Sequence, residues 1–170
     1  NWLKLTLEGQ HYGLSNTGWS ENSNISAIGT RVVLHLPEMD IMREVIGGKG
    51  HGNMEPLQLH FGLKNNMTAQ GMTIYWPSRN SNRQRKTTFV DGPIDANISY
   101  NFVENIGFVG LKGDINNDEI VNIQDIIIFM NYLLSNTLPQ EDALIWSVDM
   151  NYDNNLNVLD VVRLVNQIIN

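Results

Sequence analysis

Short segments in which apolar and polar residues alternate fill the first two thirds of the chain. Leu3, Leu5 and Leu7 alternate with polar residues, and similar segments follow at residues 32–36, 57–61, 72–76 and 98–102. Each segment is short and bounded by Gly, Pro, Asn or Ser, which is the pattern of strands joined by turns. The sequence therefore predicts an antiparallel β-sandwich or barrel-like module.

The pattern changes after residue 104. Apolar residues recur at helical spacing from Ile123 to Leu134 and again from Val158 to Ile169, with a polar loop before each run. We therefore expect a multidomain β + α chain: a β domain over residues 1–104, a linker over 105–111 and a small α-helical domain over 112–170.

The helical part contains an internal repeat. A shift of 35 residues superposes six polar residues on identical ones: Asp114 on Asp149, Asn116 on Asn151, Asp118 on Asp153, Asn122 on Asn157, Asp125 on Asp160 and Asn131 on Asn166. The last third of the chain is thus a duplication of a loop followed by a helix.

The repeated loops carry oxygen donors at the spacing of calcium ligands. Ca²⁺ takes six to eight oxygen atoms, and a twelve-residue loop supplies them from positions 1, 3, 5, 9 and 12 and from the backbone carbonyl at position 7. The first loop gives Asp114, Asn116, Asp118, Ile120 through its carbonyl, Asn122 and Asp125; the second gives Asp149, Asn151, Asp153, Asn155 through its carbonyl, Asn157 and Asp160. The sequence predicts two bound Ca²⁺ ions.

Position 6 of such a loop normally needs glycine because the backbone turns sharply there. Here it is Glu119 in the first loop and Asn154 in the second. Asn tolerates a left-handed backbone better than Glu, so we expect more strain in the first loop. The alternative is that these Asp/Asn-rich stretches are only turns, but two copies in register, each before an apolar helix, favour metal binding.

Charge and composition narrow the possible partners. The net charge is −7; residues 1–111 hold nine basic and nine acidic residues, and residues 112–170 hold two basic against nine acidic ones. An acidic segment disfavours nucleic acid as a partner, and the chain has no apolar run long enough to insert in a membrane. The chain has no cysteine, so any metal must be bound by oxygen or imidazole.

Residues 112–170 resemble a type I dockerin, on the stretch from Gly113 to Leu134 and its repeat from Val148 to Ile169. Dockerins are calcium-dependent modules that bind cohesin domains, so the resemblance implies a cohesin partner and attachment to a scaffold or cell surface. It implies eight partner-binding residues: Ile123, Gln124, Met130 and Asn131 in the first half, and Val158, Leu159, Val165 and Asn166 in the second. Many dockerins have Ser or Thr at the first pair, and the apolar residues here favour a more apolar contact. The alternative is that some of these apolar residues belong to the core.

Residues 1–104 resemble the ASPIC/UnbV domain, a small β-rich module of extracellular proteins. The matching stretches are residues 1–5, 28–32, 43–48, 57–63 and 74–78, whereas residues 49–55 depart from the family's pattern. The resemblance implies a fold and an extracellular setting rather than an activity.

No catalytic constellation stands out in the β domain. The histidines His11, His35, His51 and His60 lack a zinc spacing, and we expect His35 and His60 on polar strand faces. Tyr12, Trp19, Tyr75 and Trp76 could stack on sugars if they shared an exposed face, with core packing expected for Trp76. The basic residues Arg79, Arg83, Arg85 and Lys86 are expected in a solvated hairpin.

We therefore expect a noncatalytic, monomeric, extracellular module, the C-terminal part of a larger protein, that docks a cohesin when loaded with calcium. Two alternatives remain open. In the first, the calcium loops serve only to cap the β domain within the chain; in the second, the β domain binds or processes an extracellular glycan.

Overall fold

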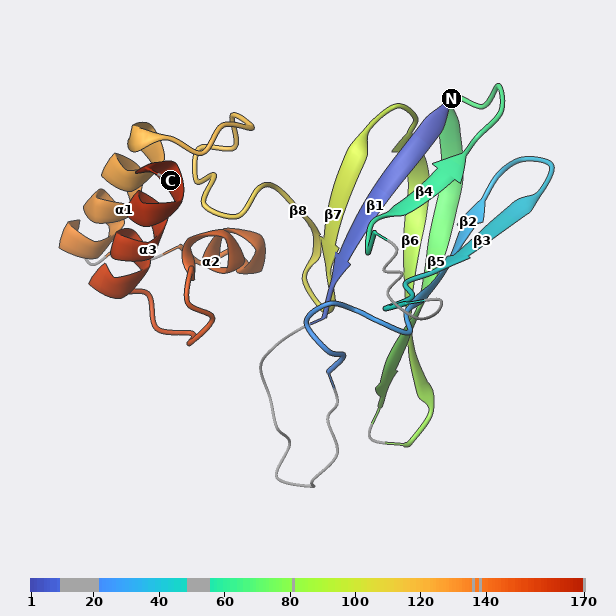
Figure 1. Ribbon diagram of the computed structural model, residues 1–170, viewed down its shortest axis with the longest axis horizontal. Helices are drawn as coiled ribbons and strands as arrows, with labels where there is room; N and C mark the ends of the chain where they lie inside the picture. Colours follow the sequence, from blue (N-terminus) through green and yellow to red (C-terminus); the bar gives the residue numbers. More distant parts are fainter. Residues whose placement is uncertain (10–21, 49–55, 81, 136, 138, 170) are drawn as a thin grey trace. The chain divides into compact units, whose positions relative to one another are not determined.

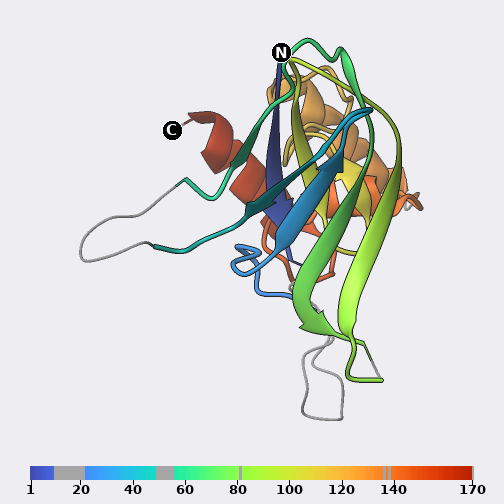
Figure 2. The ribbon, with the colours of Figure 1, turned by 90° about the vertical axis from the view of Figure 1, so that its right-hand side faces the viewer.

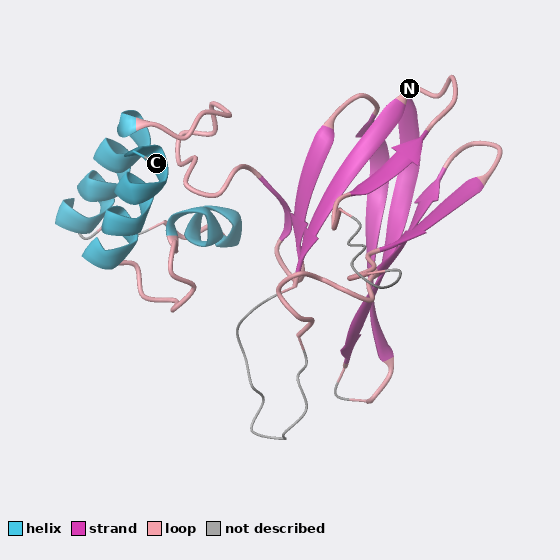
Figure 3. Ribbon diagram, viewed as in Figure 1, coloured by secondary structure: helices cyan, strands magenta, loops and turns pink. Residues whose placement is uncertain are grey.

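The computed structural model describes residues 1–9, 22–48, 56–80, 82–135, 137 and 139–169. The expectations for His11, Tyr12, Trp19, His51 and the departure at residues 49–55 lie outside the described residues. The contacts divide the chain into two compact units, Asn1–Asn105 and Ile106–Asn170. The described helices all lie in the second unit, as Figure 3 shows.

Two four-stranded sheets form the β part of the structure (Figure 1). One sheet has the order β4-β1-β7-β8, with β1 at Trp2–Glu8, β4 at Leu59–Gly62, β7 at Ser99–Val103 and β8 at Gly107–Val109. The other has the order β3-β2-β5-β6, with β2 at Arg31–His35, β3 at Asp40–Glu44, β5 at Thr68–Arg79 and β6 at Arg85–Asp95. The long β5–β6 hairpin extends beyond the other strands in both views (Figures 1 and 2).

Both sheets contribute to one hydrophobic core. Every second residue of β1 is buried, so Leu3, Leu5 and Leu7 face inward. They belong to the same cluster as Leu34 of β2 and Trp76 of β5. The alternation in the sequence therefore determines which face of each strand is buried, and the β-sandwich expected from it is confirmed.

The structure adds three strands that the alternation did not predict, β3, β6 and β8. The strand β3 is an edge strand whose residues are mostly exposed, and β6 carries charged residues, Gly92 and Pro93. The neighbouring strands, rather than local apolar pattern, hold these segments extended. Pairing is antiparallel between β1 and β4, β2 and β3, β2 and β5, and β5 and β6, but β1 and β7 pair in parallel.

The second unit contains the helices α1 at Ile123–Ser135, α2 at Asp142–Val148 and α3 at Val158–Ile169. The helices α1 and α3 pack against each other around Phe129 and Leu164, both fully buried. The two expected helices and the small helical domain are confirmed. The short helix α2, in the connection between the two repeats, was not predicted. No described helix has the length and apolar character needed to span a membrane.

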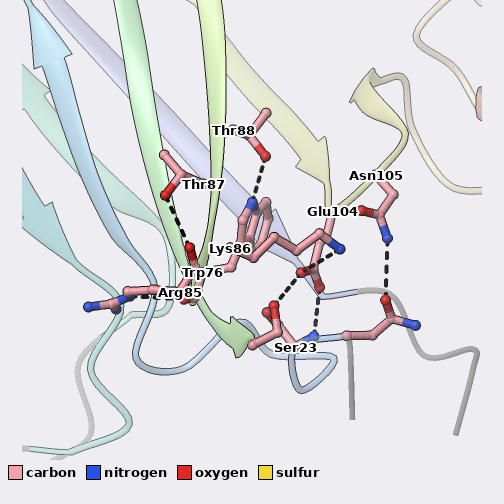
Figure 4. Close-up of polar contacts among 10 residues, drawn as sticks. Ser23, Trp76, Arg85, Lys86, Thr87, Thr88, Glu104 and Asn105 are labelled. Carbon is pink, nitrogen blue, oxygen red and sulfur yellow. Dashed lines mark hydrogen bonds and ion pairs between the residues drawn. The ribbon is translucent and has the colours of Figure 1, made fainter. Parts of the chain in front are cut away.

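A buried ion pair fastens four segments of the β unit together (Figure 4). The Glu104 carboxylate is fully buried and accepts hydrogen bonds from the Ser23 backbone N–H (2.7 Å) and the Ser78 hydroxyl (2.7 Å). The Lys86 ammonium lies 3.2 Å from the same carboxylate. Three donors thus compensate for the desolvation of Glu104.

We expect Lys86→Met to lower the free energy of unfolding of the β unit by about 3 kcal/mol, because it leaves a buried carboxylate without its counter-charge. The double variant Lys86→Met/Glu104→Gln should recover much of the loss. The control is Arg31→Met, which removes an exposed pair with Glu44 and should cost less than about 1 kcal/mol. Urea denaturation measures all three, and an equal cost for Lys86→Met and Arg31→Met would contradict the prediction.

Candidate metal centres

The two candidate calcium loops lie directly before α1 and α3. The first runs from Asp114 to Asp125, so that its last residue is in the first turn of α1. The second runs from Asp149, the residue that caps the C-terminus of α2, to Asp160 in the first turn of α3. Each loop thus ends with a carboxylate at a helix N-terminus, where negative charge is stabilised.

Both loops turn through left-handed backbone at position 6. The φ angle is +66° at Glu119 and +61° at Asn154. Position 8, Val121 and Leu156, packs against the hydrophobic core of the unit as a partly buried side chain. The backbone therefore has the sharp turn that the loop pattern requires, although neither copy has the glycine that adopts it without strain.

The two loops repeat the same hydrogen bonds at the same positions. The Asp114 carboxylate accepts from the backbone N–H of Asp118 (3.2 Å) and of Glu119 (2.8 Å). The Asp149 carboxylate accepts from the residues at the same positions of the second loop, at 3.2 and 2.9 Å. At position 12, Asp125 accepts from the Asn122 N–H (2.8 Å), and Asp160 accepts from the N–H of Asn157 (3.0 Å). The duplication in the sequence is therefore a duplication in structure.

The first and last carboxylates of both loops are buried. Asp125 and Asp160 are fully buried, and Asp114 and Asp149 are 5% and 2% exposed. Among the described residues, no Lys, Arg or His forms an ion pair with Asp114, Asp125 or Asp160. Burying carboxylates with hydrogen bonds but no counter-charge is costly. This arrangement fits a hard cation bound within each loop.

The donor set agrees with calcium if the amides and carbonyls take part. Within the described parts of the chain, no three His, Cys, Asp or Glu side chains gather into a cluster of their own. A loop would complete its coordination with Asn116, Asn122 and the Ile120 carbonyl, or with their equivalents in the second loop. Calcium accepts such mixed sets of carboxylate, amide and carbonyl oxygen.

The strained position 6 gives a direct prediction. Glu119→Gly should stabilise the calcium-loaded first loop by about 1 kcal/mol, because glycine adopts a positive φ without the penalty that Glu incurs. Asn154→Gly should give a smaller gain, since Asn tolerates this conformation. Denaturation at fixed free calcium measures both.

The matched control for charge is Glu119→Gln, which removes the carboxylate but keeps a side chain on the strained backbone. Gains of equal size from Glu119→Gln and Glu119→Gly would assign the effect to charge instead of strain.

The predicted partner-binding residues divide into two groups. Ile123, Gln124, Val158 and Leu159 are exposed, as are Asn131 and Asn166. Met130 and Val165 are partly buried and pack against the hydrophobic core, as the alternative interpretation held for some of these residues.

Sequence reasoning missed further exposed apolar residues on the same helices, among them Ile127 and Val162. Ile127 and Val162 are 55% and 51% exposed, and they lie one helical turn after Ile123 and Val158, which are 61% and 60% exposed. Their spacing of four residues was the signal that could have found them. Each helix therefore presents an apolar pair, and the two pairs are equivalent under the internal repeat.

The remaining candidates in the β unit have structural roles. Trp76 is fully buried and donates from its indole N–H to the Thr88 hydroxyl (2.9 Å), so it cannot stack on a sugar. His35 lies on a partly exposed strand face between Asp40 (2.9 Å) and Thr73 (2.8 Å), and His60 is exposed on β4.

The expected hairpin of the basic residues is present between β5 and β6, and Arg79, Arg83 and Arg85 are exposed in it, whereas Lys86 is partly buried. Arg85 donates to the carbonyls of Trp76 and Gly29, both at 2.9 Å, and Lys86 pairs with buried Glu104. These two side chains lie on a strand and reach acceptors that sequence spacing does not reveal.

Comparison with known families agrees with this division of the chain. Residues 20–104 match the family model described as ASPIC and UnbV, and residues 112–169 match the one described as Dockerin type I domain. The chain is an ASPIC/UnbV-family protein with a type I dockerin. No curated protein and no solved structure matches it.

The dockerin assignment has direct functional meaning. Type I dockerin domains bind calcium, mediate calcium-dependent protein–protein docking, typically with cohesins, and occur in extracellular proteins. The dockerin is a noncatalytic interaction module.

The ASPIC/UnbV match begins at residue 20, whereas β1 at Trp2–Glu8 is an inner strand of its sheet and fills the core. The limits 1–104, 105–111 and 112–170 stay predictions.

Proposed function

We propose that the dockerin binds two Ca²⁺ ions, one in each loop, and that this loading enables the chain to dock a cohesin. The observation that carries the proposal is the set of four buried carboxylates at matched positions 1 and 12. In the first loop, Asp114, Asn116, Asp118, Asn122, Asp125 and the Ile120 carbonyl would hold the ion. The second loop would use Asp149, Asn151, Asp153, Asn157, Asp160 and the Asn155 carbonyl.

Charge supports the need for cations. Six loop aspartates lie in residues 112–170, a segment whose formal charge is −7. Two Ca²⁺ ions would reduce that to −3, which lowers the repulsion that opposes the compact fold. The ions supply neutralisation, while the chain's own carboxylates and backbone N–H groups fix the start of each helix.

The docking surface would be the exposed face at the start of α1 and of α3. The first half offers Ile123, Ile127 and Gln124, and the second offers Val158, Val162 and Leu159. Apolar side chains that stay exposed at equivalent positions of two repeats suit a partner with an apolar centre. Met130 and Val165 would contribute less, because they pack partly against the core.

The two halves are near-equivalent, so the partner could bind in either of two orientations. The protein that carries this dockerin would then be tethered, outside the cell, to a scaffold or surface protein with a cohesin. In this proposal the ASPIC/UnbV domain is a noncatalytic part of the tethered protein.

The test is binding to a panel of purified type I cohesins by size-exclusion chromatography in the presence of 1 mM calcium or excess EGTA. A complex that forms with calcium and dissociates with EGTA supports the proposal. Absence of any complex across the panel, from a chain that binds two calcium ions and is helical, would contradict the docking role and favour an intramolecular one.

A further inference from the structure

The segments that directly precede the two calcium loops are hydrogen-bonded to each other. Lys112 and Ser147 are 35 residues apart, so each stands two residues before the first ligand of its loop. The Lys112 ammonium donates to the Trp146 carbonyl. Reciprocally, the Ser147 hydroxyl lies within hydrogen-bond distance of the Leu111 carbonyl (3.3 Å) and the Asp114 carbonyl (3.0 Å). Equivalent residues of the two repeats therefore exchange hydrogen bonds.

Further contacts stabilise these reciprocal hydrogen bonds of Lys112 and Ser147, which we call the crossing. The Gly113 N–H donates to the Ser147 carbonyl (3.0 Å). Gly113 has a φ of +92°, and a Cβ there would lie only 2.7 Å from Leu164 Cδ1, so glycine is required. The hydroxyl-bearing residue Ser147 is 6% exposed, which shields its hydrogen bonds from water.

Lys112 also touches the second loop itself. Its ammonium lies 4.1 Å from the ring centre of Tyr152, at position 4 of that loop, and 4.4 Å from the ring centre of Trp146. The Gln167 side chain of α3 donates to the Lys112 carbonyl (3.3 Å). Residues before the first loop are thus bound to α2, to the second loop and to α3.

We infer that this crossing couples the two calcium loops, with Ser147 as the positioning residue. The first ligand of loop one, Asp114, is held through its own carbonyl by a residue two positions before Asp149, the first ligand of loop two. Calcium that orders one loop therefore fixes part of the backbone of the other, so the second ion binds to a loop that is already partly ordered. The inference rests on the proposed calcium binding.

The experiment weakens one loop and measures calcium binding at the other. Asp118→Ala in loop one and Asp153→Ala in loop two remove matched exposed ligands, and calorimetry follows calcium binding at the remaining site. Coupling predicts that each variant weakens the intact loop by about tenfold, and by the same factor in both directions, because coupling is reciprocal.

The role of Ser147 is tested with two variants. Ser147→Thr keeps the hydroxyl, and Ser147→Val has the shape of the Thr variant without the hydroxyl. We expect Thr to retain the coupling and Val to reduce it below about twofold, with helicity in saturating calcium checked by circular dichroism. Ser135→Ala is the control, because its hydroxyl bonds only within the end of α1 and the segment after it.

The outcomes separate this inference from the calcium proposal. Two ions bound with affinities that do not respond to the other loop would overturn the coupling but leave the proposed function intact. Full coupling in a folded Ser147→Val variant would overturn the role of Ser147 as the positioning residue. No calcium uptake by the unmodified chain would remove the proposed function itself. If Ser147→Val does not fold, the Asp118→Ala and Asp153→Ala variants still test whether the two loops are coupled.

Discussion

Removing calcium should unfold the dockerin and leave the ASPIC/UnbV domain folded. A ligand present at a thousand times its dissociation constant stabilises the folded state by about 4 kcal/mol, so two ions contribute about 8 kcal/mol. This equals or exceeds the net stability of many small domains. The carboxylates of Asp114, Asp125, Asp149 and Asp160 are buried, and removing the ions takes away the metal charge that would offset the cost of burying them.

Circular dichroism at 222 nm during EGTA titration measures this loss. Replacing Asp125 and Asp160 by Asn should imitate chelation, because both loops lose the position 12 carboxylate. The matched control is Asp91→Asn/Asp95→Asn on the exposed side of β6, which should change nothing in the helices. Unchanged helicity in EGTA would contradict the prediction.

Changing both apolar faces should abolish cohesin binding, whereas changing either face alone should weaken it only about twofold. The near-equivalence of Ile123 with Val158 and of Ile127 with Val162 leaves one complete face in each single-face variant. Losing one of two equal orientations halves the binding constant. Losing both removes the buried apolar centre, which is worth about 4 kcal/mol, or about a thousandfold in affinity.

The variants are Ile123→Asp/Ile127→Asp, Val158→Asp/Val162→Asp and the four together, measured by biolayer interferometry against a cohesin that binds the unmodified chain. Met67→Asp is the control, since Met67 is 66% exposed but lies in the β unit. Complete loss of binding from one face alone would exclude the two-orientation account and assign docking to that half.

The calcium loops could be predicted from sequence because their chemistry constrains residue types at fixed spacing. A hard cation needs oxygen ligands at fixed loop positions. The two loops, 35 residues apart, have an oxygen-bearing side chain at each of positions 1, 3, 5, 9 and 12. The left-handed turn at Glu119 and Asn154 followed from the same loop pattern. The β-sandwich was predictable where one strand face is buried, as at Leu3, Leu5 and Leu7.

The remaining features depend on tertiary contacts that no local pattern carries. Helix α2 has seven residues, too few for a helical period to appear. Strand β6 is held by β5 despite its charges, and buried Glu104, in the turn after β7, pairs with Lys86 of β6. On α1, Met130 stands at the border between the exposed face and the core, so its position in sequence could not decide its burial.

Isothermal titration of calcium into demetallated chain tests the central claim most directly. The account predicts two ions bound per chain, and one per chain when Asp125 or Asp160 is replaced by Ala. Binding of no calcium by the unmodified chain, or an unchanged stoichiometry after both aspartates are replaced, would contradict it.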